Sequence, residues 1–280
     1  MKIRSFMRAR LLRFYPLYLL AMTLAAIRIA GLVATHAPTT KLAELFVSFG
    51  LGLFFLPSPP GPYNGLALYP LNAPTWSLGD EIVINFFYAL LHRWMRMFLL
   101  SALIAAAFLV LVVASFSGSV MGGSLWGDAY FGFARGIFSF GLGILLYRNR
   151  DKLGSLPRFA AVTPIVLVLA LSVKFQTWQS AYEIFFVSML SPLIVAAGTG
   201  KMPKWSEGVC TFLGRTSYPL YVIHMPLYIL TTVAIAKRQA DPLTVALCSL
   251  GFLLCVCWYL EILHERLRSR ITRWIEGRSP

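Results

Sequence analysis

Three polar side chains recur at helical spacing along an otherwise apolar stretch. Glu81 stands at the start of the apolar run 82–91, and Asn85 and Tyr88 follow it at positions i+4 and i+7. Residues at this spacing share one face of a helix. A carboxylate, an amide and a phenol on one stripe could orient a hydroxylated ligand. Asp80 lies about 100° round the helix from Glu81, and we expect it at the outer interface, solvated or capping.

Ionisable residues also occur in other apolar stretches, namely Arg28, Arg135 and Glu183. With a rise of about 1.5 Å per residue, Glu81 and Arg135 each lie about 7 Å inside the outer end of a predicted span. A charge at such a depth is costly unless it is paired or faces a water-filled cavity. We expect Glu81 and Arg135 to meet near the outer surface and to shape a wet, sugar-sized cavity. A purely structural ion pair that fixes helix register is the alternative, and Arg28 could simply snorkel to the interface.

His224 is the histidine nearest to the middle of a predicted membrane segment, in the stretch Tyr218-Pro-Leu-Tyr-Val-Ile-His-Met-Pro226. Histidine is the usual proton carrier in acyl transfer. Pro226 should free the carbonyl near residue 222, and His224 or Tyr221 could satisfy the exposed backbone there. A buried, hydrogen-bonded structural histidine is the alternative to a functional one.

The composition predicts a polytopic membrane protein that is all α-helical. The 280 residues are 58% hydrophobic and 13% charged, whereas soluble domains are near a quarter charged. The net charge of +14 fits the concentration of Lys and Arg in cytoplasmic loops of membrane proteins better than a nucleic-acid surface. We expect a lipid bilayer as the surroundings, with no nucleic-acid partner, no metal and no bound cofactor.

Spanning helices need about 20 mostly apolar residues. Eight segments qualify, namely 14–35, 76–92, 97–115, 130–147, 159–173, 181–199, 215–236 and 242–263. With segment 41–57 taken as re-entrant or interfacial, 19 of the 25 Lys and Arg residues face inside and 4 face outside. The positive-inside rule therefore favours eight spans with both termini cytoplasmic, rather than nine. No polar linker divides the chain, so we predict one domain over 1–280 that ends in a basic cytoplasmic tail, 264–280.

Several stretches, in the right order along the chain, resemble the membrane-bound acyltransferase 3 family. The similar stretches are Arg10-Leu-Leu-Arg13-Phe-Tyr15-Pro, Trp76-Ser77-Leu-Gly-Asp-Glu81 with the following Asn85 and Tyr88, Arg135-Gly-Ile-Phe-Ser-Phe140-Gly-Leu-Gly143, Gly214-Arg-Thr-Ser-Tyr218-Pro-Leu-Tyr221-Val-Ile-His224-Met-Pro226, and more loosely Glu265-Arg-Leu-Arg268. Each stretch is weakly specific alone, and the ordered set is more so.

The resemblance implies a multi-pass protein of the cytoplasmic (inner) membrane that O-acylates an extracytoplasmic sugar or polysaccharide. Acyl-CoA, with acetyl as the expected acyl group, would supply the acyl from the cytoplasm at the face of Arg10, Arg13 and Tyr15. Glu81 and Arg135 would be the catalytic pair. The acceptor would contact Trp76, Ser77, Asn85, Tyr88, Tyr221 and His224.

Two other functions stay open at this stage. Family members begin with two further spans, the first of which carries an Arg and a His regarded as catalytic, and the chain starts where the third span would start. A truncated or inactive chain that partners a related acyltransferase is therefore one alternative. The intramembrane charges and a Pro-containing span would also suit a transporter or flippase.

Overall fold

The computed structural model describes residues 3–35, 38–116, 120–153, 162–198, 204–235 and 241–277. Within these ranges every extended regular element is a helix, and the only β-type pairing is an isolated bridge between Gly61 and Gly65. The predicted all-α class is confirmed for the described residues. The chain forms two compact units, one of residues 1–79 with 209–280 and one of residues 80–208. The predicted single domain over 1–280 stays a prediction.

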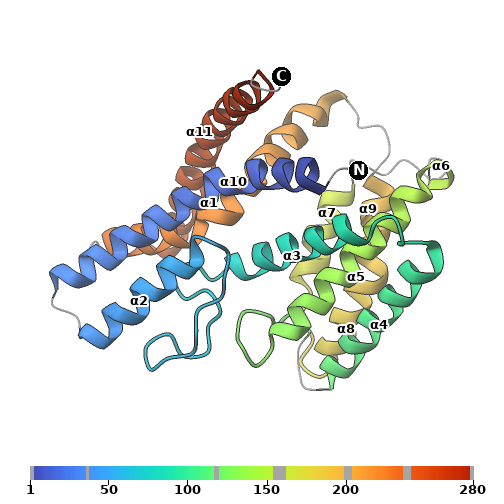
Figure 1. Ribbon diagram of the computed structural model, residues 1–280, viewed down its shortest axis with the longest axis horizontal. Coiled ribbons are helices and arrows are strands. Elements are labelled where there is room, and N and C mark those ends of the chain that lie inside the picture. The colour runs from blue at the N-terminus through green and yellow to red at the C-terminus, as the bar shows by residue number, and fades with distance from the viewer. Residues whose placement is uncertain are drawn as a thin grey trace. The chain divides into compact units, whose positions relative to one another are not determined.

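The first unit contains α1 (Ile3–Ala34), α2 (Thr39–Gly52), the start of α3 (Thr75–Leu91), and most of α10 (Lys204–Ile235) with α11 (Pro242–Glu276). Helix α1 packs against α2 and α11, and α1 and α2 run side by side (Figure 1). The last carbonyls of a helix lack partners within it. The Tyr18 hydroxyl donates to Gly52 O at 2.5 Å and the Tyr15 hydroxyl donates to Leu53 O at 3.3 Å, so α1 supplies donors to the C-terminus of α2.

Helix α2 explains the weak ninth segment, 41–57. Its 14 residues extend about 21 Å at about 1.5 Å per residue, which is less than the hydrocarbon thickness of about 30 Å. Glu44 of α2 accepts the backbone N–H groups of Tyr63 at 3.1 Å and Asn64 at 2.9 Å. Its carboxylate therefore holds the loop that follows α2. That this segment does not cross the membrane stays a prediction.

The second unit contains the rest of α3, α4 (Met97–Ser115), α5 (Ala129–Arg148), α6 (Arg150–Leu153), α7 (Thr163–Ser172), α8 (Gln179–Phe185), the π-helix η1 (Phe186–Leu190) and α9 (Ser191–Gly198). Helices α4 and α5 pack along each other around Leu111, Phe131 and Phe138. A Cβ at Gly141 would lie 2.7 Å from Ile104 of α4, and one at Gly136 would lie 2.7 Å from Ile84 of α3. Small residues at these positions let the helices approach closely, as is usual in membrane bundles.

The π-helical turn η1 has a local cause in Pro192. A proline inside a helix has no N–H to offer residue i−4, and its ring crowds that carbonyl. Here residue i−4 is Ser188, in the middle of η1. A widened π turn relieves this crowding.

Five described helices are long and apolar enough to cross a membrane, namely Ile3–Gly31, Met97–Ser115, Ala129–Arg148, Gln179–Gly198 and Leu243–Ile275. The three other predicted spans fall on α3, α7 and α10, and the start of the segment 159–173 lies outside the described residues. The chain is therefore a multi-pass membrane protein, while eight spans and cytoplasmic termini stay predictions.

The predicted basic tail, 264–280, does not form a separate segment as far as it is described. Its residues up to Glu276 continue α11 without a break. The Nη2 of Arg215 in α10 donates to both carboxylate oxygens of Glu265, each at 2.7 Å, and so ties the start of this region to α10.

Candidate functional site

Two stretches that lie about 145 residues apart in the sequence meet in the first unit. The Tyr221 hydroxyl of α10 donates to the carbonyl oxygen of Pro74, just before α3. Because that hydroxyl is thereby used as a donor, its oxygen accepts from the Ser77 hydroxyl in the first turn of α3. Ser77 and Tyr221, both predicted to contact the acceptor, therefore form one hydrogen-bonded chain. Trp76 is half-buried beside Ser77 in the same turn.

The backbone next to this chain is tied down by Asn72. Its Nδ2 donates to the carbonyl oxygen of Val222 at 2.9 Å. Val222 lies four residues before Pro226, so this is the oxygen that Pro226 leaves without its helical donor. The predicted free carbonyl is thus in the expected place, but the expected donors, His224 and Tyr221, are wrong for it. Asn72, which is 2% exposed, fills that role because the loop before α3 packs onto α10.

His224 is half-buried one turn beyond Tyr221, with the two ring centroids 6.5 Å apart. Its Nδ1 lies 2.9 Å from the carbonyl oxygen of Tyr221 and 3.1 Å from that of Leu220. A carbonyl only accepts, so Nδ1 carries the proton in the neutral ring and Nε2 carries the lone pair. Within the described part of the chain Nε2 makes no hydrogen bond. This is the tautomer of an imidazole that can accept a hydroxyl proton.

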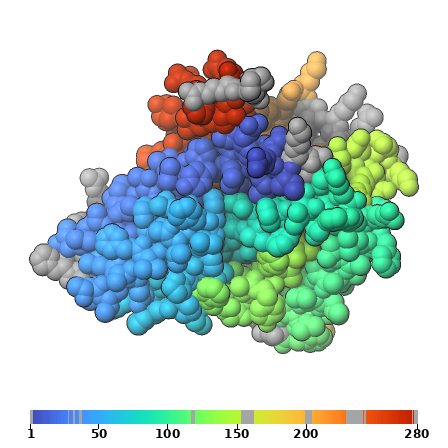
Figure 2. All heavy atoms as spheres, in the orientation of Figure 1, coloured from blue at the N-terminus to red at the C-terminus, as the bar shows by residue number. Residues whose placement is uncertain are grey.

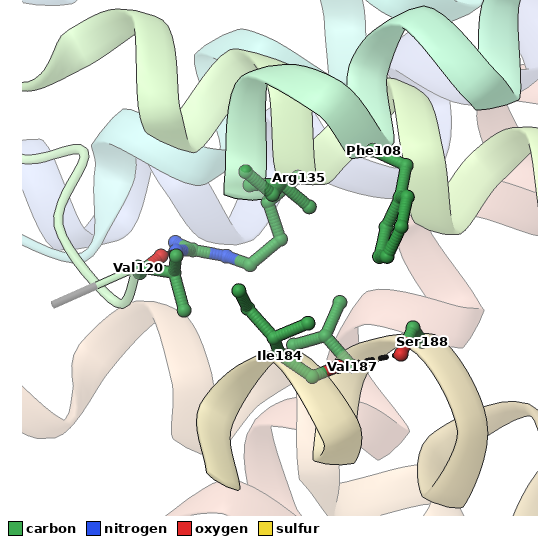
Figure 3. A pocket seen from close by; sticks show the side chains of 7 residues that line it. Phe108, Val120, Arg135, Ile184, Val187 and Ser188 are labelled. Atoms are coloured by element: carbon green, nitrogen blue, oxygen red, sulfur yellow. Dashed lines mark hydrogen bonds between the residues drawn. The ribbon is translucent and has the colours of Figure 1, made fainter. Parts of the chain in front are cut away.

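Arg135 and Glu183 belong to the second unit, where both side chains form hydrogen bonds with the backbone of Val120. Arg135 Nη1 donates to the carbonyl oxygen of Val120, and Glu183 Oε2 accepts the N–H of Val120 at 3.0 Å. Figure 3 shows the guanidinium of Arg135 reaching across to Val120. Val120 is 1% exposed and Glu183 is 6% exposed. The two charged side chains therefore anchor the residue that leads from α4 towards α5.

The space beside Arg135 is not the wet cavity that we predicted. It is lined by Phe108, Ile184 and Val187 together with Val120 and Ser188 (Figure 3). Leu111 completes the lining, and the space is too small to admit a water molecule. The lining is apolar because the Ser188 hydroxyl turns back to the carbonyl of Ile184 at 2.7 Å. An acceptor sugar does not fit at this point.

Asp80, Glu183 and Asp128 are acidic residues whose charges favour the charged form of the Arg135 guanidinium. Asp80 is half-buried, and its Oδ2 is buried without a hydrogen-bond partner among the described residues, so this oxygen differs from the expected solvated carboxylate. Glu81 is half-buried on the same helix. The roles of Glu81 and Arg135 as a catalytic pair stay predictions.

The remaining members of the polar stripe lie in unlike surroundings. Asn85 is 1% exposed, and its Nδ2 donates to the Glu81 carbonyl oxygen at 2.8 Å. Tyr88 packs edge-on against Phe140, with centroids 5.3 Å apart, and lines an apolar cavity of about 280 Å³ between α3, α4 and α5. These surroundings suit a hydrocarbon better than a sugar at Tyr88.

The predicted donor face also differs in detail. The guanidinium of Arg10 lies over the Phe6 ring at 5.3 Å, and that of Arg13 lies over the Phe14 ring at 5.6 Å. Tyr15 lines a groove of about 690 Å³ together with Arg4 and Arg8. The predicted trio is therefore divided, with Tyr15 in the groove and the two arginines stacked on aromatic rings.

Comparison with known proteins decides the family. The model of the acyltransferase 3 family, described as an acyltransferase domain, matches residues 1–262. The chain belongs to this family. It is also similar to "Protein 2 in picA locus" of Rhizobium radiobacter, with 35% identity over 124 residues, which is 40% of this chain. The match covers 63% of that relative's length. No solved structure matches the chain.

The family match includes both residue clusters described above. Sequence reasoning missed Asn72 and Val120. The inner-face arginines Arg4, Arg8, Arg10 and Arg13 were foreseeable from the sequence as groups that could bind anionic head groups or donor phosphates. Nothing near Asn72 or Val120 in the sequence indicates the partner that each one meets.

Proposed function

We propose that this membrane acyltransferase moves an acyl group, acetyl in the first instance, from cytoplasmic acyl-CoA to a hydroxyl of an extracytoplasmic sugar or polysaccharide. The cytoplasmic membrane is the proposed location. The observation that carries this proposal is the family match over residues 1–262 of a chain with five apolar helices of spanning length.

The proposed acceptor site is the Ser77, Tyr221 and His224 cluster. Its support is the tautomer of His224, since Nδ1 is committed to two backbone carbonyls and Nε2 is available as an acceptor. Nε2 would accept the hydrogen bond of the acceptor hydroxyl and orient its oxygen. The oxygen attacks the acyl carbon, the thioester C–S bond breaks, and the hydroxyl proton ends on the sulfur of CoA.

The donor would be drawn to the basic start of α1. Four arginines lie within three turns there, namely Arg4, Arg8, Arg10 and Arg13. Guanidinium groups bind phosphates strongly and in bidentate geometry. Arg10 and Arg13 are the proposed phosphate contacts of CoA. The positive-inside rule favours the cytoplasm for this end of α1.

Arg135 would act as a positioning residue in this proposal, because its guanidinium is bonded to Val120 and the space beside it is closed. It would hold the connection between α4 and α5 in place. The role of Glu81 in orienting the acceptor is proposed from the family match over residues 1–262 alone.

The test is transfer of labelled acetyl from acetyl-CoA to polysaccharide in membranes, with the product read by NMR as O-acetyl esters. His224→Asn retains an N–H close to the position of Nδ1 but removes the acceptor at Nε2, so transfer should fall by at least tenfold, in the range usual for proton-transfer groups. His92→Asn is the matched control, because His92 Nδ1 bonds the carbonyl of its own helix at Ala89 in the same way, at 2.8 Å.

Equal activity of wild type and His224→Asn would refute the role of His224. Absence of any transfer by the wild-type chain, with uptake of solute in proteoliposomes that lack an acyl donor, would instead support the transporter alternative.

A further inference from the structure

A long groove runs along the basic end of α1 in the first unit, and we call it the α1 groove. Its α1 side carries Arg4, Arg8, Leu12 and Pro16, and its other side is formed mainly by residues 53–55, just after α2. It holds about 690 Å³. Helices α1 and α2 form one continuous face of the molecule in Figure 2 (blue).

The polar and apolar parts of the α1 groove are separated along the helix. The two charged side chains, Arg4 and Arg8, lie one turn apart at one end. Beyond Arg8 the described lining offers no unused polar side-chain group, since the Tyr15 hydroxyl is engaged with Leu53 O. The ring of Phe55 stacks on the ring of Tyr18, with their centroids 4.2 Å apart. The far end of the groove is thus aromatic and aliphatic.

The length of the α1 groove suits one lipid acyl chain. Arg4 and Pro16 are twelve residues apart, which corresponds to about 18 Å of helix. Half of a hydrocarbon core of about 30 Å is about 15 Å. A ligand that fits must place an anionic group at one end and a single apolar chain along the rest.

We propose that the α1 groove is a binding site for an anionic phospholipid. The phosphate lies between Arg4 and Arg8, and one acyl chain runs past Leu12 and Pro16 towards Phe54, whose side chain is 75% exposed. Two guanidinium groups complement the anionic head group. The proposal does not depend on acyl transfer, so it can fail while the proposed function stands.

The test uses the full chain purified in mild detergent and mixed with phosphatidylglycerol and phosphatidylethanolamine of the same acyl chains, with retained lipid counted by native mass spectrometry. Wild type should retain one molecule of phosphatidylglycerol in preference to phosphatidylethanolamine. Each arginine should raise the ratio of the two retained lipids by roughly fivefold. The double variant Arg4→Gln/Arg8→Gln should lose this preference. The matched double variant Arg10→Gln/Arg13→Gln removes the same charge from the same helix, outside the groove lining, and should keep it.

A second variant guards against a folding defect. Leu12→Trp fills the apolar part while both arginines remain, and it should lower retention of phosphatidylglycerol with an unchanged unfolding temperature. A phospholipid with a photoreactive group at the chain end should label residues 53–55 in wild type and not in Leu12→Trp.

Three results would overturn the proposal. The first is an equal loss of preference in both double-arginine variants, which would indicate general charge attraction. The second is no preference in wild type. The third is displacement of the lipid by a long-chain acyl-CoA at lower concentration than by added phosphatidylglycerol, which would assign the groove to the acyl donor.

Discussion

The side-chain amide of Asn72 replaces a missing main-chain donor. Its Nδ2 donates at 2.9 Å to the carbonyl oxygen of Val222, to which Pro226 has no N–H to donate. Both groups are buried. A loop residue before α3 thereby stabilises a proline-containing helix 150 residues later in the chain. The Ser77 and Tyr221 hydroxyls meet beside this contact, so Asn72 also supports the proposed acceptor site.

Asn72→Leu should lower the free energy of unfolding by about 1–3 kcal/mol, because the Val222 carbonyl would be left buried and unpaired. Unfolding in detergent micelles, followed by circular dichroism, measures the change. Pro226→Ala is the second substitution of a double-mutant cycle, since it restores an N–H that can donate to the Val222 carbonyl oxygen within the helix. Asn72→Leu should therefore cost less in the Pro226→Ala background, and an equal cost in both backgrounds would contradict the assignment.

Arg135 and Glu183 should be coupled through Val120. Each side chain makes a charge-assisted hydrogen bond to the backbone of Val120, so Arg135→Gln or Glu183→Gln alone should destabilise the protein by about 1.5–3 kcal/mol. The double variant should lose less than the sum of the single variants, as expected for residues in one network. Additive losses would show that the two side chains hold Val120 independently.

Asp80 and Glu81 are adjacent carboxylates for which different effects are expected. Asp80→Asn removes a carboxylate whose charge favours the charged form of Arg135, so it should lower the unfolding temperature. Glu81→Gln should reduce acyl transfer by at least tenfold with little change in that temperature, if Glu81 orients the acceptor. Both variants are scored in the same O-acetyl assay and the same melting experiment. A reversed pattern would exchange the roles of the two residues.

Asp241 caps the N-terminus of α11, and the stability that this cap contributes should depend on pH. Its Oδ2 accepts the backbone N–H of Thr244 at 2.9 Å, and this hydrogen bond lowers the pKa of the exposed Asp241 carboxyl. A carboxyl whose pKa is lower in the folded than in the unfolded state stabilises the fold above its unfolded pKa, near 3.9, and loses that contribution as the pH falls through the folded pKa. Asp241→Asn should retain a cap but show a smaller fall in unfolding temperature between about pH 5 and 2. Identical pH profiles would exclude this cap as a source of the pH dependence.

The sequence predicted the helices well because hydropathy and spacing are local properties. The segments 97–115 and 130–147 fall almost residue for residue on α4 and α5. The freed carbonyl at Val222 was also foreseeable, since a proline affects the residue four positions before it. Segment 41–57 was judged weaker than the others, because Glu44 and the following prolines interrupt its apolar character, and its status as less than a full span stays a prediction.

Tertiary packing decided which polar group each of these helices meets. Depth in the membrane suggested that Glu81 would face Arg135, and this stays a prediction, but nothing in the sequence indicated that the Val120 carbonyl would accept the hydrogen bond of that guanidinium. Adjacent residues on a helix differ by about 100° in direction. The rotation of α3 about its axis, set by contacts such as Gly136 with Ile84, decides where each of its two carboxylates points and leaves no trace in the hydropathy of the segment.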